Sequence, residues 1–180
     1  MYFKKMVGKK CYLSPIDEND AEKYTEWLND YEMTKYLVGL DPVNINANKM
    51  KEILESAAKD HNYSIIDIET NEIIGDCGFE GINHLNQTSE VGIYLGNKNY
   101  WNNGYGTEAL SLLLNYGFKT LNFHSVFLQV VSFNERAIRS YEKIGFKFIG
   151  KKREAILRGT ERHDMIYMDI LHNDFYEKWE

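Results

Sequence analysis

The residues with the clearest chemical potential are two glycines, Gly104 and Gly106, at the start of a strongly helical segment. A glycine has no Cβ atom, so its backbone can adopt a positive φ and can approach a ligand closely. The first N–H groups of a helix have no partner within the helix, and the positive end of the helix dipole attracts anions. Residues 101–107 therefore predict a loop that binds phosphate or pyrophosphate through main-chain N–H groups.

Two classes of nucleotide site fit a loop with this spacing less well. In a dinucleotide-binding fold, the loop follows the first strand of a parallel sheet, and an acid about 20 residues further on binds a ribose. Gly104, Gly106 and Ala109 match that spacing, which would make the protein an NAD-dependent oxidoreductase. However, several predicted elements precede the loop, and residues 121–133 contain no acid. The chain also lacks the Gly-Lys-Ser/Thr of a nucleotide triphosphatase loop.

A second motif decides between these interpretations. Residues 134–146 read Asn-Glu-Arg-Ala-Ile-Arg-Ser-Tyr-Glu-Lys-Ile-Gly-Phe, and residues 90–95 before the loop read Glu-Val-Gly-Ile-Tyr-Leu. With the loop itself, Trp-Asn-Asn-Gly-Tyr-Gly-Thr-Glu-Ala at residues 101–109, these segments resemble the GNAT superfamily of acyl-coenzyme A N-acyltransferases. Within that superfamily, the chain is most similar to the branch of ribosomal-protein N-terminal acetyltransferases and spermidine acetyltransferases.

The resemblance implies that acetyl-CoA is the co-substrate and that specific residues bind it. Main-chain groups of residues 93–95 would bind the pantetheine in the manner of an added strand, and Asn134 would hydrogen bond to it where two strands diverge. Arg136 and Arg139 would either reach the nucleotide phosphates or remain solvated helix charges. The full set of expected cofactor contacts is Ile93, Tyr94, Leu95, Trp101, Asn102, Asn103, Gly104, Tyr105, Gly106, Thr107, Asn134, Arg136 and Arg139.

The loop departs from the usual family pattern at three positions. The family commonly has Gln or Arg where Trp101 stands, then Gly where Asn102 stands, and Lys or Arg where Asn103 stands. Because backbone N–H groups provide most of the phosphate binding in such loops, we expect these departures to weaken CoA binding without removing the site.

Acyl transfer from a thioester to an amine also requires groups that move protons. A lysine-like amine costs about 4 kcal/mol to deprotonate at neutral pH, so a carboxylate or an ordered water must accept its proton. Glu90 is the best candidate for this base, with Glu80 and Asp76 as alternatives. The resemblance implies that Tyr141 donates a proton to the leaving CoA sulfur, and the motif favours this role over the alternative of a core aromatic on the apolar helix face.

The acceptor amine is less well determined by the sequence. The family pattern places His163 and Asp164 beside the acceptor pocket, although a lone histidine at the start of a strand is more often structural. A polyamine or an aminoglycoside would fit the acidic balance of the chain, whereas a protein N-terminus would fit the branch resemblance. A CoA-binding module without catalytic activity is a further alternative. No Cys/His spacing predicts a metal site, and the mechanism needs none.

Composition limits the partners and the location of the protein. The chain has 180 residues, of which 43% are hydrophobic, and it has only two prolines, which predicts a single domain over residues 1–180. A net charge of −6 argues against nucleic acid as a partner. No signal peptide, disulfide framework or apolar run of about 18 residues is evident, so we expect a soluble cytoplasmic protein that does not bind membranes. The sequence does not determine the oligomeric state, and a homodimer is one of the alternatives.

The pattern of apolar residues predicts the elements that position these groups. Together with the resemblance, it gives an α/β (α+β) fold with a mixed, mostly antiparallel central sheet, flanked by helices and split to hold acetyl-CoA. The expected helices are residues 21–28, 32–37, 48–59, 107–121 and 135–144. The expected strands are residues 10–16, 63–68, 73–82, 90–95, 125–133, 146–152 and 163–171. Turns are expected at residues 39–42 and 69–72, and a polar loop at residues 158–162.

Overall fold

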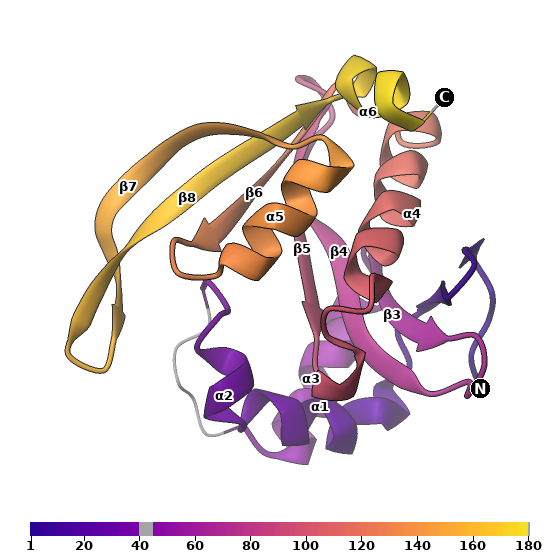
Figure 1. The fold of residues 1–180 in the computed structure, drawn as a ribbon. Helices are drawn as coiled ribbons and strands as arrows, with labels where there is room; N and C mark the ends of the chain where they lie inside the picture. The colour runs from indigo at the N-terminus through magenta and orange to yellow at the C-terminus, as the bar shows by residue number, and fades with distance from the viewer. Residues whose placement is uncertain (40–44, 180) are drawn as a thin grey trace.

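The computed structural model describes residues 1–39 and 45–179. Within these ranges one sheet of eight strands runs in the order β1-β2-β3-β4-β5-β6-β8-β7 (Figure 1). All neighbouring strands are antiparallel except β5 and β6, which are parallel. The strands are β1 (Met6–Val7), β2 (Cys11–Pro15), β3 (Asn62–Asp67), β4 (Ile73–Asn83), β5 (Thr88–Leu95), β6 (Ser125–Val131), β7 (Lys147–Arg158) and β8 (Glu161–Leu171).

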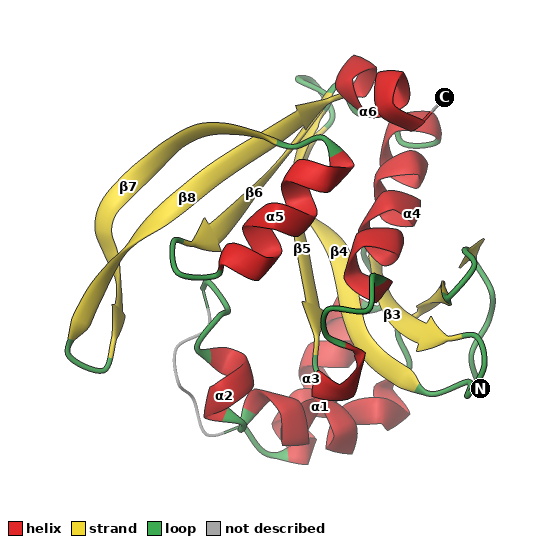
Figure 2. Ribbon diagram, viewed as in Figure 1, coloured by secondary structure: helices red, strands yellow, loops and turns green. Residues whose placement is uncertain are grey.

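Helices cover both faces of the sheet (Figure 2). Side chains of Asp30, Asn46 and Asn134 each accept a backbone N–H at the start of a helix, because the first N–H groups there lack helical partners. The described helices are α1 (Ala21–Leu28), α2 (Tyr31–Thr34), α3 (Ala47–Ala57), α4 (Tyr105–Lys119), α5 (Glu135–Ile144) and α6 (His172–Trp179).

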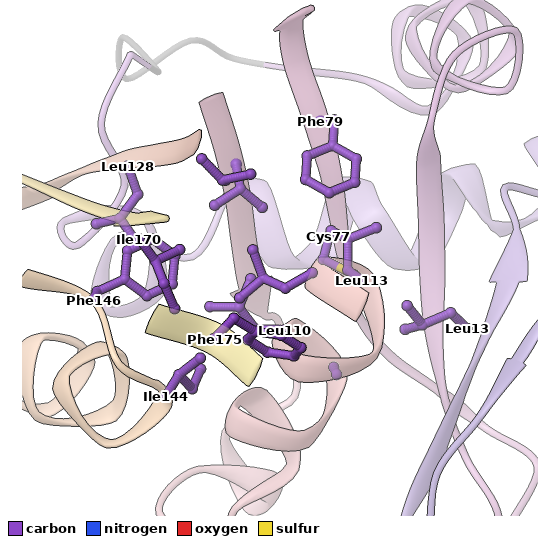
Figure 3. Packing of buried hydrophobic residues seen from close by; sticks show 14 of the residues in the cluster. Leu13, Cys77, Phe79, Leu110, Leu113, Leu128, Ile144, Phe146, Ile170 and Phe175 are labelled. Atoms are coloured by element: carbon purple, nitrogen blue, oxygen red, sulfur yellow. The ribbon is translucent and has the colours of Figure 1, made fainter. Parts of the chain in front are cut away.

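Two hydrophobic clusters lie on opposite faces of the sheet. Side chains alternate between the faces along a strand, so neighbouring residues such as Ile65 and Ile66 in β3 belong to different clusters. The larger cluster joins α4 and α6 to the sheet through residues that include Leu13, Leu110 and Phe175 (Figure 3). The smaller cluster joins α1 and α3 to the opposite face. Burial on both faces therefore fixes the sheet that carries the site.

The expected fold class is confirmed, and several element boundaries are corrected. The helix expected over residues 32–37 ends at Thr34 as α2, and α4 begins at Tyr105 rather than at residue 107. The short strand β1 and the helix α6 are additional elements. The turn expected at residues 39–42 lies, apart from Gly39, outside the described residues.

The largest difference from the sequence-based expectation is the last hairpin. The strands β7 and β8 continue to Arg158 and from Glu161, so the expected polar loop is a short turn at the tip of a hairpin that extends away from the body (Figure 1). The register shifts within β7 at Lys152/Ile156, where Glu154 has a φ of 51°. Such a bulge breaks the alternation of side chains, which explains why the sequence pattern ended the strand too early.

Candidate active site between β5 and β6

The sheet opens between its only parallel pair of described strands. β5 and β6 pair over Thr88–Glu90 and Ser125–Phe127 alone, and beyond these residues they diverge (Figure 1). A cavity of about 920 Å³ lies here, a size typical of ligand sites. Its walls come from α1, α2 and α3, from β4 and β5, from the loop before α4, and from α5. The residues 93–95, which the sequence assigned to pantetheine binding, lie on this opening and line the cavity.

The glycine loop begins α4 at the edge of this cavity. Gly104 is the N-cap residue, with a φ of 84°, and no side chain caps the helix, so its first N–H groups are open to a ligand. Asn102 also has a positive φ, of 62°, which asparagine tolerates better than most residues. Gly106 lines the cavity, and a Cβ at this position would make only an ordinary contact with Leu95. The local geometry therefore fits a main-chain anion site.

Two side chains that the sequence analysis did not identify hold this loop. The Lys10 ammonium donates to the carbonyl oxygen of Asn103 at 2.8 Å. The Glu108 carboxylate accepts hydrogen bonds from the backbone N–H groups of Lys9, Lys10 and Cys11 at 2.7, 2.8 and 3.1 Å. Both contacts join residues more than 90 positions apart, so no local sequence signal could have predicted them.

Trp101 connects the loop to both sides of the opening. Its indole N–H donates to the Leu95 carbonyl oxygen at 2.8 Å, so that oxygen already has a protein partner. The Arg136 guanidinium, on α5, lies 3.8 Å from the centroid of the Trp101 ring, which is a cation–π contact. Arg136 is therefore a packed residue rather than a solvated helix charge. Arg139, by contrast, forms an exposed ion pair with Glu135 at 3.0 Å.

The second motif begins with Asn134 and places Tyr141 in the cavity. The Asn134 side-chain oxygen accepts from the Ala137 N–H at 3.3 Å, and both Asn134 and Tyr141 line the cavity. Burial raises the pKa of Tyr141 to about 12, although the positive charge of Arg136 opposes the shift. Its phenol is therefore protonated at neutral pH. Among the described residues, no protein group hydrogen bonds to this hydroxyl, which leaves it able to donate to a ligand.

Three carboxylates face the cavity from the sheet. Asp76, Gly78 and Glu80 alternate along β4, and the register places Gly78 opposite Gly92 and Glu80 opposite Glu90 in β5. All five residues line the cavity. A Cβ on Gly92 would meet nothing within 4 Å, so this glycine leaves open space between the acidic positions. The arrangement is an acidic surface beside the cofactor opening.

The environment of these carboxylates changes their pKa values. Burial raises the pKa of Asp76 to about 8, and the charge of Glu80 adds to this shift. Burial also raises the pKa of Glu90, while a hydrogen bond from Gln129 at 2.8 Å to its Oε1 opposes the shift. A carboxylate with a raised pKa is a stronger base than an ordinary one.

The structure does not bring His163 and Asp164 to this surface. Asp164 lies on the β7–β8 hairpin, where it pairs with Lys151 at 2.6 Å and accepts from the Glu154 N–H at 2.9 Å. The His163 ring packs on Phe133, with 4.6 Å between ring centroids. Neither residue is among the described residues that line the cavity. The expectation that they border the acceptor pocket was therefore wrong.

Two general features of the described chain bear on the chemistry. No group of three or more His, Cys, Asp or Glu side chains in residues 1–39 and 45–179 is arranged to hold a metal ion. Over the same residues, no helix has the length and apolar character that crossing a membrane requires. The groups that line the site include the Tyr141 phenol and the carboxylates of Asp76, Glu80 and Glu90.

Comparisons with known proteins agree with this geometry. Residues 10–147 match the family model described as an acetyltransferase (GNAT) domain. The uncharacterized N-acetyltransferase p20 of Bacillus licheniformis is 30% identical over 169 residues, which cover 92% of each chain. The spermidine N(1)-acetyltransferase of Escherichia coli K12 is 31% identical over 94 residues, which cover 52% of this chain and 50% of that protein.

A solved structure of an acetyltransferase shares this fold. A spermidine N-acetyltransferase from Vibrio cholerae, in complex with CoA and spermine, superposes with a TM-score of 0.84 at 20% identity and covers 94% of this chain and 99% of its own. The chain belongs to the GNAT acetyltransferase family. It is an N-acetyltransferase with acetyl-CoA as co-substrate. The dinucleotide interpretation of Gly104 and Gly106 is thereby overturned, because the loop follows a strand of a mostly antiparallel sheet.

Proposed function

We propose that the protein transfers the acetyl group of acetyl-CoA directly to a primary amine that enters the acidic side of the cavity. The observation that carries this proposal is the continuity of the cavity. Its lining includes the glycine loop and Tyr141 on one side, and Asp76, Glu80 and Glu90 on the other. One space can therefore hold a thioester and an amine together, which is the requirement for transfer without a covalent enzyme intermediate.

In this proposal the chain binds the cofactor mainly through its backbone. The N–H groups at the start of α4 bind the pyrophosphate, and main-chain groups of residues 93–95 bind the pantetheine, with Asn134 as a further donor. The Leu95 carbonyl is already paired with Trp101, so the other main-chain groups of this strand carry the contact. Because backbone groups provide the binding, the side-chain departures at residues 101–103 are compatible with it.

The chemical steps follow from the protonation states. The neutral amine nitrogen attacks the thioester carbonyl carbon, and the C–S bond breaks. Glu90, directly or through a water, accepts the proton that the amine loses, since its raised pKa favours proton uptake. The Tyr141 phenol donates a proton to the CoA sulfur as it leaves, and solvent restores that proton.

The acidic surface favours an acceptor with more than one amino group. One nitrogen must be neutral at the thioester, whereas a second ammonium group can remain charged beside Asp76 and Glu80. Carboxylates in a cavity attract such cations and raise their local concentration. A polyamine is therefore the acceptor class that the site fits best, and the similarity to spermidine acetyltransferases supports it.

An amine panel tests the proposal. The enzyme is incubated with acetyl-CoA and, separately, spermidine, spermine, kanamycin and a tetrapeptide with a free N-terminus, and thiol release is measured. We expect release with the polyamines, and a fall in kcat of about 100-fold or more in Tyr141→Phe with CoA binding unchanged. Tyr176→Phe, on α6, is the matched control. Binding of CoA without thiol release from any amine would support a binding module instead.

A further inference from the structure

The stretch of residues 35–37 follows α2 and forms part of the cavity wall. The sequence predicted a helix to residue 37, but α2 ends at Thr34, and the next three residues continue in a less regular conformation. Tyr36 and Leu37 line the cavity, alongside residues of α1 and α3 on the acceptor side. The position of this stretch therefore affects the shape of the acceptor site.

Arg158 holds the stretch from the tip of the β7–β8 hairpin. Its Nε donates to the Lys35 carbonyl oxygen at 3.0 Å, and its Nη2 donates to the Leu37 carbonyl oxygen at 2.6 Å. A third bond, from Nη1 to the Leu157 carbonyl at 2.9 Å, fixes the guanidinium on its own strand. A rigid fork of donors suits two carbonyls on one turn, and a lysine ammonium cannot reproduce it. The length of the hairpin brings Arg158 to the stretch.

The opposite side of the stretch packs against the cofactor side of the opening. The Tyr36 ring lies 5.5 Å from the Arg136 guanidinium and 6.1 Å from the Trp101 ring, measured to ring centroids. It also lies 5.7 Å from the Phe133 ring. Residues 35–37 are thus held by carbonyl bonds on one side and by ring contacts on the other.

We propose that Arg158 is a positioning residue for the acceptor amine, because it sets the cavity wall formed by residues 35–37. Arg158 itself does not appear among the described residues that line the cavity, so its effect must pass through this stretch. The inference rests on the proposed function. The expected effect of Arg158 differs from that of Arg136. Arg136 contacts Trp101 of the cofactor loop, so its loss would change the binding of both substrates.

Loss of the two bonds has a selective consequence. Without these two hydrogen bonds the stretch is free to move, and the balance of cavity conformations shifts by roughly tenfold or more. The amine then binds to a less defined wall, whereas the cofactor contacts at the loop and Asn134 do not involve Arg158. We expect the KM of the amine to rise and the KM of acetyl-CoA to stay within about twofold.

Steady-state kinetics of Arg158→Ala and Arg158→Lys test this inference with the best amine of the panel above. Arg162→Ala is the matched control, because Arg162 lies on the same hairpin and its Nη1 donates to the Glu154 carbonyl at 3.3 Å rather than to residues 35–37. The expected result is a roughly tenfold rise in the KM of the amine for Arg158→Ala, a smaller rise for Arg158→Lys, and none for Arg162→Ala. The KM of acetyl-CoA should stay within about twofold in both Arg158 variants, and the thermal midpoint should fall by only a few degrees, because two hydrogen bonds are lost.

The outcomes separate the inference from the function it depends on. An unchanged KM for the amine in both Arg158 variants overturns the inference, as does an equal loss for amine and acetyl-CoA, which a merely structural role would give. If Arg158→Ala does not fold, Arg158→Lys decides by the same two constants. A wild-type enzyme that acetylates no amine of the panel contradicts the proposed function itself.

Discussion

At the scale of single residues, the protonation of Asp76 determines the pH range in which its side chain can attract a cation. With a pKa of about 8, Asp76 is mostly protonated at pH 7 and becomes charged as the pH rises past this value. An ammonium group bound beside it would stabilise the charged form and lower that pKa. Asp76 is therefore suited to binding a cation, whereas Glu90, with Gln129 bonded to its carboxylate, is better placed to accept a proton.

The substitution Asp76→Asn tests this difference through its pH dependence. At about pH 6.5 the wild-type side chain is neutral, so the variant should bind spermidine almost as well as the wild type. At about pH 9 the wild-type carboxylate is charged, and the variant should show a KM for spermidine several-fold higher. Asp60→Asn, an exposed site outside the cavity, is the control. A variant-to-wild-type KM ratio that is the same at both pH values would contradict the raised pKa.

Sequence motifs located single residues when the signal was local. Gly104 and Gly106 lie on α4 and its cap, and Asn134 and Tyr141 lie on α5 and its cap. Each pair is therefore local in sequence, and all four residues line the cavity. The contacts of Lys10, Glu108 and Arg158 depend on residues about 90 to 120 positions away. Periodicity contains no information about such contacts. The position of His163 relative to the cavity could not be predicted for the same reason, because it depends on the direction in which the β7–β8 hairpin runs.

At the scale of elements, β4 and β5 determine the size of the acceptor site. Both strands carry a glycine at the cavity face, and the two glycines are opposite each other in the register. They do not have equal roles. A Cβ at Gly78 would collide with the Asn62 side chain, whereas a Cβ at Gly92 would enter open space. Gly92 is therefore the position where the volume of the cavity can be reduced without a clash with protein atoms.

Replacing Gly92 with leucine should block the acceptor side. The side chain would project opposite Gly78, between the register positions of Asp76 and Glu80. We expect kcat/KM for spermidine to fall about tenfold or more while the thermal midpoint changes little. Gly150→Leu, in β7, is the matched control, because a Cβ there also meets nothing within 4 Å but lies outside the cavity. Equal activity of Gly92→Leu and the control would show that amines bind elsewhere.

The strands and helices themselves were largely predictable because each buries one face. Alternation located β3 and β4, and helical spacing located α3 and α4 within a few residues. The largest boundary error falls where no apolar face is buried. β7 is mostly exposed, so its length depends on pairing with β8 rather than on burial. The residues after α2 depend on Arg158 and Tyr36 instead of helix propensity.

At the scale of the whole molecule, two hydrophobic clusters hold two groups of helices on one sheet, and the site lies where the sheet opens between them. This arrangement explains why one cavity receives walls from segments that range from Tyr24 to Lys143. The sequence predicted the opening only through the family resemblance, because strand divergence leaves no local pattern. A single domain over residues 1–180 and a homodimer stay predictions.

The central claim is that acetyl transfer from acetyl-CoA to an amine takes place within this cavity. Mass spectrometry of a reaction with spermidine and acetyl-CoA tests it most directly. The account predicts one acetylated spermidine for each CoA released, and no acetyl group on the enzyme. CoA released without acetylated amine, or a stable acetyl-enzyme that later reacts with spermidine, would contradict direct transfer.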